Sequence, residues 1–236
     1  MQENNFHILS TRPVDPLFVR KAGELGVHID MLPFIETESL VSETLRRQLG
    51  LLADRPMTAV FTSMNAVQAL AAFLKPASRN WKVFCLGNTT RKLVAELFGE
   101  DSIAGTAASA SGLARQMLEA EVREAFFFCG DQRREELPAA LRKEGVDLKE
   151  IVVYRTVATA HLVEKPYDGI SFFSPSAVHS FFSLNQPGPA TVLFAIGETT
   201  ASAIREYSNN ELITGLHPDK ESLLEEAIAY FCNKTR

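Results

Sequence analysis

The sequence predicts an α/β protein built on parallel β-sheets. Short apolar segments rich in Val, Ile and Phe alternate along the chain with stretches that have the apolar spacing of amphipathic helices. Strands that are apolar along their whole length are typical of parallel sheets with helices on both faces. The second half of the chain also repeats the order of motifs found in the first half, so we expect two related α/β units.

Six segments have the strand pattern, because each is a compact apolar run bounded by turn-forming residues. In chain order they are residues 6–9, 58–61, 83–86, 125–128, 169–173 and 191–196. Helical spacing follows them at residues 15–25, 66–74, 90–98, 134–144, 177–184 and 200–207. Gly26 and Gly145 follow two of these helices and are suited to end them, since glycine readily adopts the left-handed conformation of a C-cap.

The repeat is defined by two pairs of motifs. Residues 61–67 align with 172–178, and residues 83–90 align with 193–200, at offsets of 111 and 110 residues. A weaker similarity links residues 6–36 with 125–156. A simple tandem division would cut the chain near the Ser-, Ala- and Gly-rich stretch 105–112, which the sequence permits but does not require.

The composition excludes several classes of protein. With 236 residues, 46% of them hydrophobic and 22% charged, the chain is globular in composition and has room for one large or two small domains. No apolar run approaches the roughly 20 residues that span a bilayer, and the N-terminus is unlike a signal peptide, so we expect a cytoplasmic protein. A net charge of −5 without a basic block argues against nucleic-acid binding. Cys85, Cys129 and Cys232 lack metal-ligand spacing, so no metal is expected.

Four turns at predicted helix starts are candidate anion sites. Each repeat has one strand that ends in Ser, at Ser63 and Ser174, and another that ends in Gly-x-Thr-Thr, at residues 87–90 and 197–200. Glycine lets a ligand approach the backbone, a hydroxyl caps the helix, and free N–H groups favour carboxylate or phosphate. Each turn alone is better explained as a simple helix cap, but four turns at matched positions of two repeats favour binding. None has the pattern of a nucleotide-binding loop.

Other residues leave two interpretations open. Tyr154 lies in the β-branched segment 151–156 and is either an ordinary strand aromatic or a phenolic proton donor. Arg133 and Arg134 belong to a charged run that either starts a solvated helix or faces a ligand carboxylate. The five histidines form no recognisable catalytic pairing, and the cysteines lie in or beside apolar runs, where they favour the core.

Taken in order, these motifs resemble the uroporphyrinogen-III synthase family along nearly the whole chain. Each motif is weak alone, but the preserved order makes the set fairly specific. The set comprises residues 10–13, 26–33, 61–67, 87–90, 129–137, 141–145, 153–156, 172–178, 196–200 and 218–223. Arg91 and Glu198 depart from the family pattern at the two Gly-x-Thr-Thr turns.

The resemblance implies two flavodoxin-like α/β domains with parallel sheets, one of them discontinuous, joined by a two-strand linker. Residues 1–34 and 160–236 would form the discontinuous domain, residues 38–154 the inserted one, and residues 35–37 and 155–159 the linkers. A tetrapyrrole substrate would bind in the cleft between the domains. The tandem division near residues 105–112 is the alternative to this arrangement.

The resemblance further implies a cyclising hydro-lyase of tetrapyrrole (heme) biosynthesis. Hydroxymethylbilane would close to uroporphyrinogen III with loss of water and inversion of ring D through a spiro intermediate, without cofactor or metal. Because the bilane closes spontaneously to the wrong isomer, the main task is to hold a flexible octacarboxylate in one geometry. Tyr154 matches the family tyrosine that is thought to assist departure of the hydroxyl. Substrate-binding candidates are Arg12, Ser63, Asn65, Gly87, Thr90, Ser174, Ser176, Gly197, Thr199 and Thr200.

We expect a monomer that acts on this small molecule, with no nucleic-acid or membrane partner. Two other classes of function remain as alternatives. A non-catalytic bilobal sensor would close on a small anion and form no product. A two-domain glycosyltransferase would need a nucleotide-sugar site, and the sequence has neither an acidic metal motif nor a clear diphosphate loop.

Overall fold

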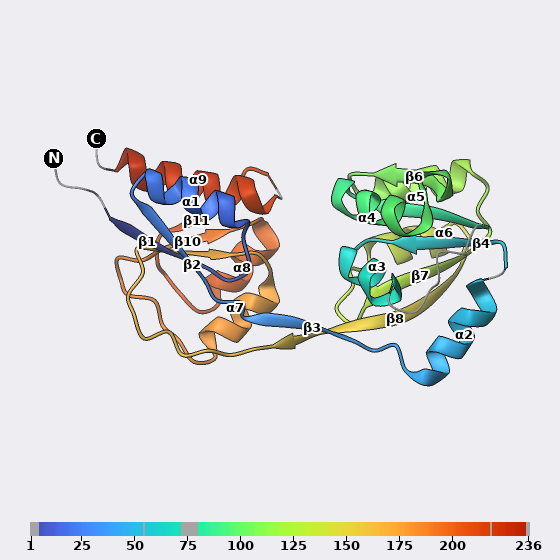
Figure 1. Ribbon diagram of the computed structural model, residues 1–236, viewed down its shortest axis with the longest axis horizontal. Coiled ribbons are helices and arrows are strands. Elements are labelled where there is room, and N and C mark those ends of the chain that lie inside the picture. The colour runs from blue at the N-terminus through green and yellow to red at the C-terminus, as the bar shows by residue number, and fades with distance from the viewer. Residues whose placement is uncertain (1–4, 54, 72–79, 218, 235–236) are drawn as a thin grey trace. The chain divides into compact units, whose positions relative to one another are not determined.

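The computed structural model describes residues 5–53, 55–71, 80–217 and 219–234. The chain divides into two compact units, which are coloured by residue number in Figure 1. Unit 1 consists of Met1–Glu36 and Val157–Arg236, and unit 2 consists of Thr37–Thr156. Each unit is built on one sheet, so the predicted fold class is confirmed. No helix in the described ranges is long and apolar enough to cross a membrane.

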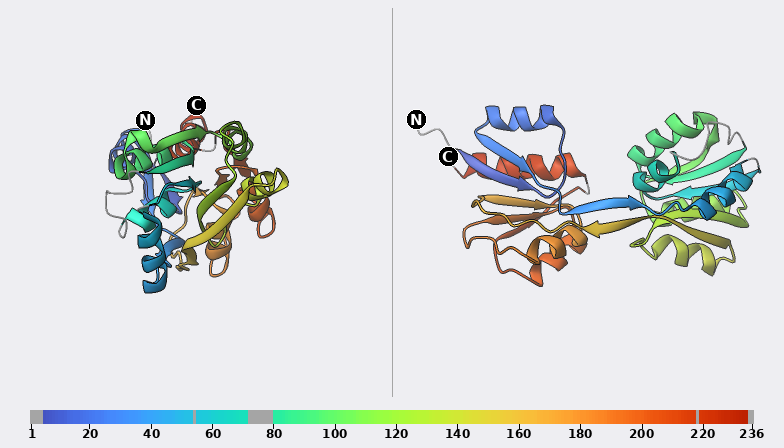
Figure 2. Two further views of the ribbon diagram at one scale, coloured as in Figure 1. Left: turned by 90° about the vertical axis from the view of Figure 1, so that its right-hand side faces the viewer. Right: turned by 60° about the horizontal axis from the view of Figure 1, so that its bottom comes forward.

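Unit 1 has a five-stranded parallel sheet in the order β11-β10-β9-β1-β2. Helices α1 and α9 cover one face, and α7 and α8 cover the other (Figure 2). The strands are β1 (Phe6–Ser10), β2 (Val27–Met31), β9 (Gly169–Phe172), β10 (Val192–Ala195) and β11 (Leu212–Thr214). The helices are α1 (Pro16–Glu24), α7 (Pro175–Phe182), α8 (Glu198–Arg205) and α9 (Lys220–Asn233).

Unit 2 has a six-stranded sheet in the order β3-β8-β7-β4-β5-β6. Helices α2, α3 and α4 pack on one face, and α5 and α6 pack on the other. The strands are β3 (Ile35–Ser39), β4 (Met57–Phe61), β5 (Trp81–Leu86), β6 (Ile103–Ala107), β7 (Glu124–Gly130) and β8 (Asp147–Ala158). The helices are α2 (Glu43–Ala53), α3 (Met64–Ala71), α4 (Asn88–Phe98), α5 (Ala110–Glu119) and α6 (Glu136–Lys143), with the 3-10 turn η1 (Glu100–Ser102) after α4.

The chain passes between the units along two paired strands, β3 and β8. Leu40 N donates to Val153 O at 2.9 Å, and Thr159 N donates to Phe34 O at 3.0 Å. The residue numbers run in opposite directions in these two bonds, so the pair is antiparallel, whereas the other pairs given for this sheet are parallel. Arg155 on β8 also pairs with Glu38 on β3.

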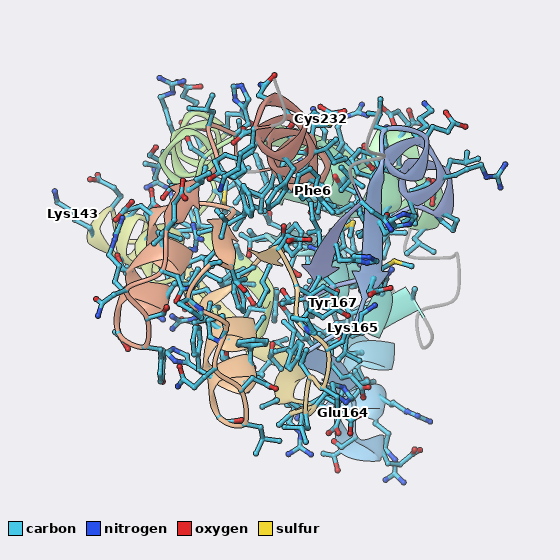
Figure 3. The ribbon with its side chains drawn as sticks, turned by 90° about the vertical axis from the view of Figure 1, so that its left-hand side faces the viewer. Phe6, Lys143, Glu164, Lys165, Tyr167 and Cys232 are labelled. Carbon is cyan, nitrogen blue, oxygen red and sulfur yellow. The ribbon has the colours of Figure 1, made fainter. Side chains whose placement is uncertain are left out.

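The segment that returns to unit 1 after β8 is fastened to β2. Tyr167 donates a hydrogen bond to Asp30 Oδ2 at 2.9 Å, and Lys165 pairs with the same oxygen; both side chains are labelled in Figure 3. Burial alone would raise the pKa of Asp30, but the bonds from Lys165 and Tyr167 outweigh it and hold this pKa below its usual value. The carboxylate of Asp30 therefore ties two segments that are distant in sequence.

The predicted strands and helices all correspond to observed elements, with shifted ends. The predicted helix at residues 66–74 is observed as α3 up to Ala71, and its last three residues lie outside the described part of the chain. The tandem division near residues 105–112 is wrong, because this stretch lies inside unit 2. It contains the end of β6 and the start of α5, where Ser109 caps the helix by accepting a bond from Gly112 N.

Candidate active site

The predicted site residues gather at the carboxyl edges of the two sheets. In unit 2, the adjacent strands β8, β7, β4 and β5 bring Tyr154, Ser63 and Gly87 to one edge. In unit 1, the adjacent strands β1, β9 and β10 do the same for Arg12 and Ser174. Neighbouring parallel strands all end on the same side of a sheet, and ligands of open α/β sheets bind at that edge.

Tyr154 owes its position to a β-bulge between β7 and β8. Cys129 pairs with Val152, but the next residue, Gly130, pairs with Tyr154, so β8 contains one extra residue here. A Cβ atom on Gly130 would lie only 2.5 Å from Cζ of the Tyr154 ring. Glycine therefore leaves the space that the ring occupies, and the bulge redirects the tyrosine.

The phenol of Tyr154 is held by Ser63, which lies two residues after the end of β4. The Tyr154 hydroxyl donates to Ser63 Oγ at 3.1 Å. The N–H of Asn65, in the first turn of α3, donates to the same oxygen at 3.1 Å. Ser63 thus accepts two bonds and keeps its own hydroxyl hydrogen for another acceptor. The structure brings together three residues that the sequence predicts for the site.

A pocket of about 450 Å³ opens beside Tyr154, within unit 2. Small-ligand pockets commonly enclose roughly 300–1,000 Å³, so this one has room for part of a substrate. Its polar lining comes from strand ends and from the starts of α5 and α6. These polar residues are Thr62, Ser63, Ser109, Gln132, Arg133, Arg134, Glu136 and Tyr154.

The loop between β7 and α6 forms one wall of this pocket. Arg133 pairs with Glu150 on β8 and with Glu135. The hydrogen bonds to these carboxylates, first of all to Glu150, raise the pKa of Arg133 and so favour its charged form. Asp131 N donates to Tyr154 O at 3.1 Å, while Asp131 Oδ1 accepts from Thr156 N at 3.0 Å. The loop is therefore fastened to β8 on both sides of Tyr154.

The serine turn of unit 1 differs in detail from that of unit 2. Ser174 is the N-cap of α7, and its side chain accepts from Ala177 N at 3.2 Å. Ser63, by contrast, binds the phenol of Tyr154 as well as a backbone N–H. Ser176 lies half-buried in the first turn of α7. The repeat in sequence thus yields a helix cap in one unit and a tyrosine partner in the other.

The two Gly-x-Thr-Thr turns have the same pattern of exposure. Gly87 and Gly197 are the N-caps of α4 and α8, without a side-chain cap, so the expectation that a hydroxyl caps these helices is wrong here. Thr90 and Thr200 are buried, at 5% and 3% exposure, whereas Thr199 is exposed. Burial leaves Thr90 and Thr200 little surface for a ligand. Gly87 has a φ of 81°, a conformation in which a Cβ atom is strained.

The two charged residues that depart from the family pattern at these turns each have an oppositely charged partner close by. Arg91 pairs with Glu100 in η1. Glu198 pairs with Arg205, one helix length further along α8. The charge of Glu198 is therefore offset by a neighbouring cation, and its effect on an anion at the Gly197 turn is reduced.

Arg12 follows β1 and is partly buried, without a carboxylate partner in the described part of the chain. Its Nε atom is buried and has no hydrogen-bond partner among the described residues. Its guanidinium carbon lies 5.6 Å from the ring centroid of Phe173. Burial lowers the pKa of Arg12 because the charged form loses water. An anion at this edge of unit 1 would satisfy the unpaired nitrogen.

Two features of the site were not singled out in the sequence: Gly130 makes room for Tyr154, and Ser109 starts the α5 wall of the pocket. Of the two arginines of the charged run, Arg134 rather than Arg133 is without a partner among the described residues. Only the charged run gave a signal, and it could not separate Arg134 from Arg133. Cys85 and Cys129 are buried, as expected for core cysteines, whereas Cys232 is half-buried. Burial raises the pKa of Cys129 to about 11, which suppresses thiolate formation.

Fold and site together define a class of α/β protein with two units, each built on a mainly parallel sheet with candidate site residues at its carboxyl edge. A sequence profile of the family described as uroporphyrinogen-III synthase HemD matches residues 17–225, so the chain belongs to the uroporphyrinogen-III synthase family. The predicted family and its activity, cyclisation of hydroxymethylbilane to uroporphyrinogen III by a hydro-lyase, are thereby confirmed. No curated protein sequence matches the chain.

Solved structures agree with this fold. The uroporphyrinogen-III synthetase from Helicobacter pylori 26695 has a TM-score of 0.69 and 20% identity, with 95% of this chain and 99% of that chain covered. A mutant uroporphyrinogen III synthase from Thermus thermophilus has a TM-score of 0.59 and 15% identity, with 97% and 99% covered. At these identities the likeness concerns the fold.

Proposed function

We propose that Tyr154 donates the proton that lets the substrate hydroxyl leave as water, and that the carboxyl edges of both sheets bind the substrate's carboxylates. The observation that carries the first part is the hydrogen bond from Tyr154 to Ser63 at the wall of a pocket. A phenol fixed in direction beside a ligand-sized pocket is placed for general acid catalysis.

The proton balance of the reaction is consistent with this role. The C–O bond of the hydroxymethyl group breaks, and the departing oxygen takes the phenolic proton and leaves as water. A C–C bond first forms at the substituted α-carbon of ring D, which gives the spiro intermediate. The bond from that carbon to its original methylene bridge then breaks. The bridge bonds to the free α-carbon of the inverted ring, which gives up one proton as its aromaticity returns. That proton restores Tyr154, so no net acid is consumed.

Ser63 supports this step by stabilising the phenol oxygen of Tyr154 as it loses its proton. As Tyr154 turns its proton towards the substrate, the phenol oxygen becomes an acceptor. The unused hydrogen of Ser63 then points to the developing phenolate, while the N–H of Asn65 holds the Ser63 oxygen in place. A donor held next to developing negative charge stabilises that charge and lowers the barrier.

The carboxylates of the substrate are proposed to contact the turns of both units. Arg12 is partly buried, and its buried Nε atom has no hydrogen-bond partner among the described residues. The N-terminal turns of α4, α7 and α8 add backbone N–H groups, with Gly87, Gly197, Ser176 and exposed Thr199 as the reachable residues. Thr90 and Thr200 are proposed to shape these turns from the buried side.

The decisive experiment measures which uroporphyrinogen isomer is formed. Hydroxymethylbilane is generated in situ, the protein is added, and the oxidised type I and type III products are separated by chromatography. We expect type III from the unmodified chain. Tyr154→Phe should lower kcat by about 10²-fold, a typical contribution of general acid catalysis, with KM little changed.

Tyr230→Phe is the matched control, because the Tyr230 hydroxyl donates to Glu211 in unit 1 and lies outside the proposed site. Its kcat should stay at the unmodified value. An unchanged kcat in Tyr154→Phe would remove the proposed role of the phenol. Type I alone from the folded, unmodified chain would instead support the anion-sensor alternative.

A monomeric state and a cytoplasmic location stay predictions. Light scattering of the purified chain at several concentrations would test the first of them.

A further inference from the structure

Arg134 is a cation of the unit 2 pocket that has no partner among the described residues. Within that part of the chain its side chain forms no ion pair or hydrogen bond, and it is exposed where it lines the pocket. We propose that Arg134 binds a carboxylate arm of the pyrrole ring that carries the reacting hydroxymethyl group. This inference rests on the proposed function, since Tyr154 lines the same pocket.

The neighbouring Arg133 cannot serve in this way. Its Nε and Nη2 atoms donate to Glu150, and its Nη1 atom donates to Glu135. All three nitrogens are therefore engaged with carboxylates of the protein. Arg133 instead fastens the loop to β8. Of the pair, Arg134 is therefore the arginine whose guanidinium has no partner in the described ranges.

The backbone on either side of Arg134 is well anchored. Asp131 is bonded to both Tyr154 and Thr156 of β8, and Glu135 also accepts a bond from Arg142 on α6 at 2.9 Å. Arg134 therefore projects from a loop that is held at both ends, and binding a carboxylate has to order the side chain rather than the loop. A planar guanidinium matches two carboxylate oxygens in a bidentate pair.

The pocket also contains one uncompensated anion among the described residues, Glu136, at the start of α6. Its side chain forms no ion pair or hydrogen bond within that part of the chain. Glu136 repels the same substrate arm that Arg134 attracts, so removing its charge should strengthen binding. Opposite effects of the two residues form a signature that a general loss of folding would not produce.

The test compares Arg134→Ala, Arg134→Lys, Glu136→Gln and the control Arg115→Ala in the isomer-resolved assay. Arg115 lies on α5, is highly exposed and carries the same charge outside the pocket lining. We expect Arg134→Ala to raise KM about tenfold, as expected for loss of one charged hydrogen bond, with kcat within about twofold. Arg134→Lys should recover part of the loss, and Glu136→Gln should lower KM.

Equal KM values for Arg134→Ala and Arg115→Ala would overturn the inference and leave the proposed function standing. Binding of the fluorescent octacarboxylate uroporphyrin III, measured for the unmodified chain and Arg134→Ala, separates the two ideas. Suppose that the unmodified chain forms no type III product but that Arg134→Ala weakens the binding of uroporphyrin III. The proposed catalytic role of Tyr154 then fails, while the role of Arg134 as an anion ligand is kept. Equal binding by both chains overturns that role as well.

Discussion

At the scale of single residues, the site depends on side chains that are small. Gly130 has no Cβ atom, and the ring of Tyr154 occupies the space that a Cβ atom would fill. Ser63 is small enough to sit at the end of β4 and accept bonds from both Tyr154 and Asn65. The chemistry of one tyrosine is thus prepared by neighbours that react with nothing themselves.

Ser63→Ala tests this support. Removing the hydroxyl takes away the donor to the developing phenolate and leaves Asn65 N without its acceptor. We expect kcat to fall about tenfold, in line with about 1.4 kcal/mol for one such hydrogen bond, while KM changes little. Ser183→Ala is the control, because Ser183 Oγ bonds Ser180 O in unit 1. A kcat equal to that of the control would contradict the role of Ser63.

At the scale of elements, similar sequence motifs form similar turns, but their side chains make different contacts. The Gly-x-Thr-Thr motif begins α4 and α8 with the same order of half-buried, exposed and buried residues. The serine turns before α3 and α7 diverge: Ser63 accepts a bond from Tyr154 on β8, whereas Ser174 accepts one from the backbone of α7. In the loop between β7 and α6, Asp131 and Arg133 bind residues of β8. Helix α6 therefore begins only after them, at Glu136.

Gly130→Ala tests the register of β7 and β8. The added Cβ atom meets the Tyr154 ring, so the ring or the strand must shift. We expect a loss of about 1–3 kcal/mol of unfolding free energy, as for overpacked cores, together with a kcat close to that of Tyr154→Phe. Urea unfolding and the isomer-resolved assay measure the two effects.

Gly50→Ala is the matched control for that substitution. Gly50 lies within α2, and nothing comes within 4 Å of an added Cβ atom. Alanine in a helix interior should raise stability by about 0.5–1 kcal/mol without an effect on kcat. If Gly130→Ala behaved in the same way, the ring of Tyr154 would not depend on this glycine.

At the scale of the whole molecule, unit 2 is an insertion into unit 1. All hydrophobic clusters of unit 2 are formed by residues between Val41 and Tyr154, whereas those of unit 1 combine both ends of the chain. Strand β1 lies between β2 and β9, so the N-terminal segment completes a sheet that begins again after residue 157. Unit 2 therefore has a complete core of its own.

The fragment 37–156 is expected to fold alone, since a domain with its own core can do so. Circular dichroism should show helix and strand with a cooperative thermal transition, and an amide NMR spectrum should be well dispersed. A fragment 1–110, cut near the tandem boundary, is the comparison. It separates β1 from β9 and β4 from β7, so we expect it to stay unfolded. Folding of 1–110 with unfolding of 37–156 would contradict the division into units.

Much of the fold could be predicted because its signals are local. The apolar segments of β1, β4, β5, β7, β9 and β10 are buried, so their side chains alone identify them. The apolar pattern did not indicate strand β3, because most of its residues are exposed and form no apolar run; a linker strand at residues 35–37 followed only from the family resemblance. Strand β2 alternates buried Val27 and Ile29 with polar residues, which gives a weaker pattern than a continuous apolar strand.

The sequence by itself determined the α/β class, the internal repeat, the family and the residue types of the turns, because apolar spacing and ordered motifs are properties of neighbouring residues. Only the tertiary structure decided that Gly130 faces Tyr154, that Ser63 holds the phenol, and that Arg133 is paired while Arg134 has no partner within the described part of the chain. These facts depend on strand register and on contacts between residues such as Ser63 and Tyr154, which lie 91 positions apart. Local pattern contains no information on which distant side chains will meet, since a bulge of one residue changes every partner that follows it.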